Sequence, residues 1–190
     1  MNKSKAFTLI EMLVAVTIFT LVIGSATGLF IAAVRSQARA LAAQKLLDET
    51  SYTIEYMSRA LRMARKETKA PNGCLSQNGL NYENPSGDDS IRFINMYNIC
   101  QEFRLDEDFL KERKSTDETA NNLPLVQDAL PLTSDDFEVS SLNFNLSGQQ
   151  EPPADNLQPR ITISMTIGKK PNLKPQIKIQ TTISQRNLDL

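Results

Sequence analysis

The sequence predicts an α+β protein in which one long N-terminal helix is followed by a head with an antiparallel β-sheet. Three observations predict this class. Residues 12–34 contain no charged side chain, residues 35–70 carry apolar side chains at steps of three and four, and the C-terminal part alternates with period two. At 190 residues, the chain is long enough for one domain with an appendage.

The composition is that of a folded protein, and it argues against several functional classes. Hydrophobic residues make up 41% and charged residues 23% of the chain, and there is no histidine, the commonest general base. No phosphate-binding glycine loop is present. Residues 71–190 carry eleven basic and seventeen acidic side chains, so no basic surface dominates there. We expect no enzymatic activity, no metal site and no direct nucleic-acid partner.

The uncharged stretch, residues 12–34, has the length of a membrane-spanning helix. Its 23 residues would extend roughly 34 Å as a helix, enough for the hydrocarbon core of a bilayer. Lys3 and Lys5 precede it, which favours a cytoplasmic N-terminus. The stretch is longer than the apolar region of a cleaved secretory signal. Length and hydropathy alone leave a simple signal anchor as the alternative.

A single carboxylate, that of Glu11, lies at the start of this apolar helix. A charged group in a membrane segment is costly and usually marks a function with a definite partner. An unpaired carboxylate in lipid either becomes protonated or pairs with a cation. Glu11 is therefore a candidate for pairing with a cation of a neighbouring chain, and a side chain that extends to the lipid headgroups is the alternative.

Residues 5–15 read Lys-Ala-Phe-Thr-Leu-Ile-Glu-Met-Leu-Val-Ala and closely resemble the processing signal of type IV prepilins and type II secretion pseudopilins. The resemblance implies that residues 1–6 are a leader, which a prepilin peptidase removes between Ala6 and Phe7 before the same enzyme methylates the new amine of Phe7. It further implies that Glu11 pairs with the terminal amine of a neighbouring subunit. Ala6 departs from the family, which favours glycine there, and this puts the efficiency of cleavage in doubt.

Gly24 and Gly28 form a small-xxx-small pattern in the same apolar segment, residues 7–34. Small residues at this spacing allow two helices to approach closely. The pair is a candidate helix-packing contact, and two merely tolerated glycines are the alternative.

Residues 35–70 are predicted to continue the helix as an amphipathic segment, to about Lys69. No proline or glycine interrupts residues 29–70, and Pro71-Asn72-Gly73 supplies a stop signal. The apolar stripe of this segment requires a cover from the rest of the chain, and a coiled-coil dimer is the alternative use of it. Its members are Ala43, Leu47, Thr50, Ile54, Met57, Leu61 and Ala64.

The head, residues 71–190, is predicted as one antiparallel sheet of four to six strands laid on the amphipathic helix. Three segments alternate clearly between apolar and polar residues, and two less regular segments precede them. They are residues 142–147, 161–167 and 177–184, and before them 91–93 and 99–105. Residues 111–136 and 148–160 are polar and are predicted as loops.

Cys74 and Cys100 are the only cysteines. A head outside the cytoplasm lies in an oxidising compartment, where two thiols of a small domain often pair. A disulfide here would stabilise the fold by roughly 3–4 kcal/mol through its closed loop. Two free thiols are the alternative.

The acidic clusters of the head are candidate calcium ligands, since carboxylate oxygens suit this ion. They are Asp88-Asp89, Asp106-Glu107-Asp108 and Asp135-Asp136. None shows a defined calcium spacing, so solvated turns are the favoured interpretation and no cofactor is expected.

The resemblance implies a structural subunit of a type IV pilus-like or type II secretion pseudopilus filament, anchored in the bacterial inner membrane with a periplasmic or extracellular head. Its partners would be the prepilin peptidase/methyltransferase, other pilin or pseudopilin subunits and the inner-membrane assembly platform. The chain size, the segment 57–62, the strand at 142–144 and the closing residues 181–188 are similar to minor pseudopilins of the J or pilus-W type, which lie near the filament tip. The alternative is a single-pass membrane-anchored binding or sensor module that does not polymerise.

Overall fold

The computed structural model describes residues 7–124, 126–148, 157–171 and 174–186. Its longest element is helix α1, Leu9–Arg62, which contains no proline. By its contacts the chain divides into two units between Ala42 and Ala43. The second unit contains the C-terminal part of α1 and every described strand.

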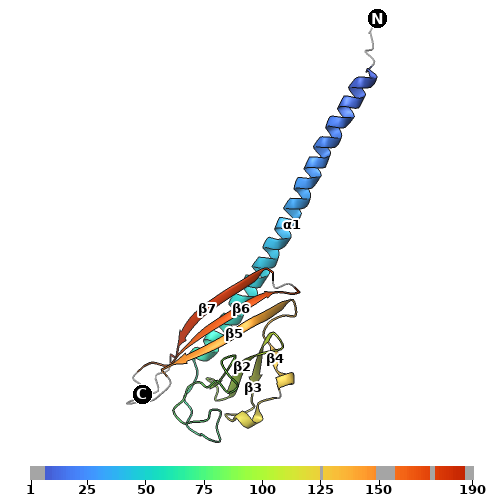
Figure 1. Ribbon diagram of the computed structural model, residues 1–190. Coiled ribbons are helices and arrows are strands. Elements are labelled where there is room, and N and C mark those ends of the chain that lie inside the picture. The colour runs from blue at the N-terminus through green and yellow to red at the C-terminus, as the bar shows by residue number, and fades with distance from the viewer. Residues whose placement is uncertain (1–6, 125, 149–156, 172–173, 187–190) are drawn as a thin grey trace. The chain divides into compact units, whose positions relative to one another are not determined.

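The described residues of the head form two antiparallel sheets (Figure 1). The first has the order β1-β2-β3-β4 and the second the order β5-β6-β7. Two 3₁₀ turns, Ala120–Asn122 and Val126–Asp128, lie between β3 and β4. The strands are β1 Ser90–Ile94, β2 Cys100–Asp106, β3 Phe109–Lys114, β4 Leu130–Pro131, β5 Phe137–Ser147, β6 Arg160–Lys169 and β7 Gln176–Ser184.

The three-stranded sheet has one buried face, as its alternating sequence predicts. On β6, Ile161, Ile163, Met165 and Ile167 are all buried, and polar residues lie between them. On β5 the register shifts between Val139 and Ser141. This β-bulge inserts one extra residue, so Val139 and Leu142 both reach the core although they are three positions apart.

The C-terminal part of α1 supplies the other side of this core. Its buried residues are Leu46, Thr50, Thr53, Met57 and Leu61. The predicted stripe is correct at Thr50, Met57 and Leu61 but wrong at Leu47, which is 49% exposed. Steps of three and four fit two adjacent faces of a helix nearly equally well, and only packing against the sheet selects one of them.

Helix α1 ends at Arg62, and the prediction that it continues to Lys69 is wrong. Leu61 O accepts a hydrogen bond from the Tyr82 hydroxyl at 2.7 Å, and Arg62 O accepts one from Arg186 N at 2.8 Å. Arg65 N donates to Ile94 O at 2.8 Å, beside β1. Partners from distant parts of the head therefore satisfy backbone groups that a longer helix would have used. Burial also raises the pKa of Tyr82.

The four-stranded sheet contributes Phe93, Phe103 and Leu110 to the same core. The rings of Phe93 and Phe103 lie 5.6 Å apart between centroids. Strand β3 falls partly within the segment that was predicted as a polar loop. Its sequence, Phe-Leu-Lys-Glu-Arg-Lys, lacks apolar alternation. Its charged side chains have partners within the head, such as Asp106 for Lys111 and Glu102 for Arg113.

A buried group of ion pairs surrounds Glu102 of β2. Its side chain is fully buried among three arginines. Its carboxylate accepts from Arg92 Nε at 2.9 Å, from Arg104 Nη1 at 3.4 Å and from Arg113 of β3. A buried charge is tolerated when it is paired and hydrogen-bonded in this way. The α+β class and the antiparallel head are confirmed, whereas the single sheet is wrong because the head has two.

Candidate functional site

The N-terminus of α1 carries the residues that the sequence singles out for processing and assembly. Glu11 Oε2 accepts from Thr8 N and from Thr8 Oγ1, each at 3.2 Å. In return, Glu11 N donates to Thr8 Oγ1 at 3.3 Å. This reciprocal arrangement is a capping box, which satisfies backbone N–H groups at the start of a helix. The pattern Thr-x-x-Glu was visible in the sequence, but the sequence analysis did not use it.

The capping box leaves part of the carboxylate for another chain. Every hydrogen bond described for Glu11 as acceptor uses Oε2, so Oε1 remains available to a cation from outside. Phe7 is 79% exposed at the start of the described chain. Ala6, on the other side of the expected cleavage point, lies outside the described residues.

Large apolar side chains are exposed along the first half of α1. They include Leu9, Ile10, Phe19, Leu21, Leu29 and Phe30. Helix α1 is long and apolar enough to cross a membrane by length and composition. Such a surface is unfavourable in water and suits lipid or the packed interior of a helical bundle.

The hydroxyl groups in this apolar segment bond to the helix itself. Thr17 Oγ1 donates to Val14 O at 2.8 Å, and Ser25 Oγ donates to Val22 O at 2.9 Å. Thr20 and Thr27 make the same kind of bond to carbonyls one turn earlier. Each hydroxyl is therefore satisfied without water, as a membrane segment requires.

Gly24 and Gly28 lie in open space within the described chain. A Cβ added at either position would meet no heavy atom within 4 Å, apart from near neighbours in the helix. Neither glycine is needed for a contact inside this chain. Their role in packing against another helix stays a prediction.

Cys74 and Cys100 form a disulfide with a Cα–Cα distance of 5.4 Å. Cys100 begins β2, and both residues are buried in a small cluster with Leu75 and Ile94. The bridge joins the loop after α1 to the start of β2, an inner strand of the four-stranded sheet.

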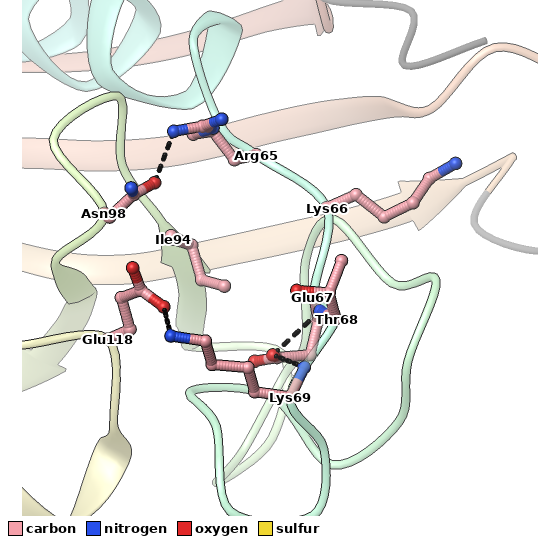
Figure 2. A pocket seen from close by; sticks show the side chains of 8 residues that line it. All are labelled: Arg65, Lys66, Glu67, Thr68, Lys69, Ile94, Asn98 and Glu118. Carbon is pink, nitrogen blue, oxygen red and sulfur yellow. Dashed lines mark hydrogen bonds and ion pairs between the residues drawn. The ribbon is translucent and has the colours of Figure 1, made fainter.

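Glu67 lies beside this disulfide and was missed by the sequence analysis. Its side chain is buried, and its two oxygens accept four backbone N–H groups. Oε1 accepts from Thr68 and Lys69 at 2.9 and 2.7 Å (Figure 2). Oε2 accepts from Cys74 and Leu75 at 2.7 and 2.9 Å. One carboxylate thereby organises the loop of residues 67–75, in a way that no periodic pattern signals.

Gly73 is required for this arrangement, because a Cβ added there would overlap both oxygens of Glu67. The Pro71-Asn72-Gly73 turn, interpreted from sequence as a helix stop, serves as the part of the loop that approaches the buried carboxylate.

A pocket of about 370 Å³ opens next to this loop (Figure 2). Its polar groups are largely occupied by one another. Arg65 Nη1 donates to Asn98 Oδ1, and Lys69 Nζ lies 2.5 Å from Glu118 Oε2. The pocket therefore presents no pair of groups arranged for nucleophilic or acid–base catalysis among the residues described.

Two of the three acidic clusters of the head contact cations of the chain itself, whereas Asp88 of the third accepts from Asn84 Nδ2 at 3.3 Å. Asp106 Oδ2 lies 2.6 Å from Lys111 Nζ, and Asp136 Oδ2 lies 2.5 Å from Lys45 Nζ. Over the described ranges, no group of three histidine, cysteine, aspartate or glutamate side chains is arranged to hold a metal ion. Calcium binding remains an untested alternative.

Comparison with known families gives one match, to the prokaryotic N-terminal methylation motif, over residues 1–27. No curated protein and no solved structure matches the chain significantly. The matched segment includes Ala6, Phe7, Glu11 and Gly24, but none of the head. It implies processing by a prepilin peptidase, and it supports a membrane-anchored subunit of the type IV pilin and pseudopilin kind.

Proposed function

We propose that this chain is a minor, tip-proximal subunit of a type IV pilus-like or type II secretion pseudopilus filament. The prepilin peptidase cuts between Ala6 and Phe7 and methylates the new amine. The apolar half of α1 first anchors the subunit in the inner membrane, with the head on the outer side, and then packs among the helices of the filament.

The observation that carries this proposal is a methylation motif at the start of an exposed apolar helix with one carboxylate. A segment with so much exposed apolar surface needs lipid or other helices around it. A filament supplies the second environment after the membrane supplies the first. The proposed tip position rests on the chain size and on segments 57–62, 142–144 and 181–188, and not on the motif.

In this proposal Glu11 aligns the subunit along the filament axis. The methylated amine of a neighbouring Phe7 is a cation in an apolar environment, and the free Oε1 of Glu11 accepts it. Pairing neutralises two charges that would each be costly alone, while the surrounding apolar side chains supply most of the packing energy. Gly24 and Gly28 give the helix a narrow face for close approach to a neighbour.

The first test is intact-mass and N-terminal peptide analysis of the protein purified from its own membranes. The expected mature chain begins at N-methylated Phe7. A chain that retains Met1, or one that begins beyond the apolar segment, would contradict the proposal.

The second test separates the charge of Glu11 from its capping role. Glu11→Gln keeps an oxygen for the capping box, which accepts Gln as well as Glu, but removes the charge. Thr8→Val removes the hydroxyl cap and keeps the charge. We expect both variants to be processed, and only Glu11→Gln to be lost from the sheared filament fraction. Normal incorporation of Glu11→Gln would refute the pairing.

The second candidate function is a membrane-anchored binding or sensor module. The specific observation in its favour is the capping box, because it gives Glu11 a partner within the chain. For such a module, neither variant would change the distribution of the protein, which would stay in the membrane fraction.

A further inference from the structure

We propose that a groove on the head docks an acidic peptide segment that carries an apolar side chain, supplied by another subunit. The groove lies between the last turns of α1 and the β1–β2 hairpin, and it has a volume of about 980 Å³. We call it the hairpin groove and define it by Arg59, Arg62, Met63, Met96, Tyr97 and Arg186. That the partner is a filament subunit rests on the proposed function, whereas the chemistry of the groove does not.

The floor of the hairpin groove is a connected set of polar side chains. Asn95 Nδ2 donates to Gln101 Oε1 at 2.9 Å. Gln101 Nε2 and the Tyr56 hydroxyl both donate to Glu112 Oε1, at 2.5 and 2.8 Å. Lys114 Nζ donates to the Tyr56 hydroxyl at 2.9 Å. These groups satisfy one another, so the floor is pre-organised and does not itself require a ligand.

The rim carries two large apolar side chains that the fold leaves uncovered. Met96 is 50% exposed and Tyr97 is 73% exposed, at the tip of the β1–β2 hairpin. The hairpin is held in place by Asn95 Oδ1, which accepts from Tyr97 N at 2.9 Å and from Ile99 N at 3.1 Å. Exposed aromatic and methionine side chains on a rigid turn are typical anchors of protein interfaces.

The lining of the groove also carries positive charge. Arg59 pairs with Glu55, one turn away on α1. Arg62 and Arg186 are both exposed, and their backbones are joined by the hydrogen bond from Arg186 N to Arg62 O at 2.8 Å. Within the described parts of the chain, neither of these two guanidinium groups has a side-chain partner. Guanidinium groups match carboxylates in bidentate geometry, and two unpaired ones in the lining of one groove favour an acidic partner.

The chemistry favours a peptide over a nucleic acid. Phosphate backbones are bound by long tracks of cations, and the hairpin groove offers two unpaired guanidiniums on a head that is acidic overall. Apolar anchors and cations in one lining fit a segment in which carboxylates alternate with aliphatic or aromatic side chains.

The test is a fluorescence anisotropy titration of the full-length protein in detergent micelles. The probe is a short labelled peptide of glutamate and leucine, compared with a peptide in which lysine replaces glutamate and another in which serine replaces leucine. We expect the glutamate–leucine peptide to bind most tightly. Arg62→Glu combined with Arg186→Glu should weaken its binding by about tenfold or more, as expected when charge-assisted hydrogen bonds are lost.

Two further variants keep the result interpretable. Lys178→Glu reverses an exposed charge on β7, away from the groove, and should leave the affinity within about twofold, since remote surface charges are screened. Tyr97→Ala removes an apolar anchor and should weaken the leucine peptide more than its serine counterpart. Circular dichroism checks that each variant is folded.

Equal binding of the glutamate–leucine peptide to the arginine double variant would overturn the proposal. Absence of binding, or tighter binding of a single-stranded oligonucleotide than of the peptide, would overturn it as well. None of these outcomes depends on cleavage before Phe7. A wrong assignment of the groove and a wrong assignment of the filament role are therefore distinguishable.

Discussion

The buried carboxylate of Glu67 provides the sharpest test of how the head is held together. It accepts two pairs of backbone N–H groups, and the pair from Cys74 and Leu75 is buried. Glu67→Gln keeps one oxygen but turns an amide NH₂ group towards the other pair of donors. Each buried N–H left without an acceptor costs about 1–3 kcal/mol. Because the amide oxygen can face the buried pair and leave the part-buried pair from Thr68 and Lys69 without an acceptor, the substitution should lower the free energy of unfolding by about 2 kcal/mol, the lower end of the range for two donors.

The assay is equilibrium urea unfolding of the full chain in detergent micelles with the disulfide intact. Unfolding is followed by near-UV circular dichroism of the tyrosines, because the chain has no tryptophan. Glu55→Gln is the matched control, since Glu55 is 62% exposed in an ion pair with Arg59. Loss of this ion pair should lower the free energy of unfolding by less than about 0.5 kcal/mol.

A second substitution checks the same contact from the other side. Gly73→Ala forces the new methyl group against both oxygens of Glu67, so it disturbs the same hydrogen bonds. The decrease in the free energy of unfolding should be smaller for the double variant than the sum of the decreases for the two single variants, because both substitutions act on one contact. The reasoning would be refuted if Glu67→Gln cost less than about 1 kcal/mol, a single net hydrogen bond, or if the two effects added fully.

Two further predictions concern the packing of α1 and the charges of the head. Met57→Ala should lower the free energy of unfolding by about 2–5 kcal/mol in the same assay, since Met57 is fully buried. Leu47 lies in an exposed position that sequence periodicity had predicted to be buried, so Leu47→Ala should lower it by less than about 1 kcal/mol. The hydrogen bond and charge of Lys45 lower the pKa of the exposed Asp136. Because the folded pKa is the lower one, this stabilisation is present above about pH 4, the ordinary value for an aspartate, and is lost as the pH falls through the lowered pKa. Lys45→Met should raise the pKa of Asp136 in a carboxyl NMR titration and leave that of Asp117 unchanged, and an unaltered Asp136 would contradict the ion pair.

Much of the head could be predicted from alternation alone. Strands β5, β6 and β7 were found because their apolar residues face one core, and β1 and β2 were found with less regular patterns. Strand β3 was missed because Glu112 occupies an inward position and is satisfied by Tyr56 and Gln101, which come from two other elements. A hydrophobic pattern cannot reveal a buried position whose partner is polar.

The division of the strands into two sheets also could not be predicted from the sequence. Val139 N of β5 donates to Asp108 O, and Phe144 N donates to Asp88 O, so loops of the first sheet occupy part of the outer edge of β5. These hydrogen bonds prevent the two sets of strands from joining into one sheet. Alternation specifies which face of a strand is buried, but not which strand lies beside it.

By itself, the sequence determined the N-terminal helix, its membrane-compatible surface and the motif that marks it for cleavage and methylation. These properties are local: charge, hydropathy and capping depend on residues within a few turns of one another. Only the tertiary structure decided where α1 ends, which of its faces is buried, and that the hairpin groove exists. Their partners are far apart in the chain, as where Gln185 Nε2 donates to Ala64 O across 121 positions. Contacts over such separations depend on the whole packing arrangement, and no short pattern encodes them.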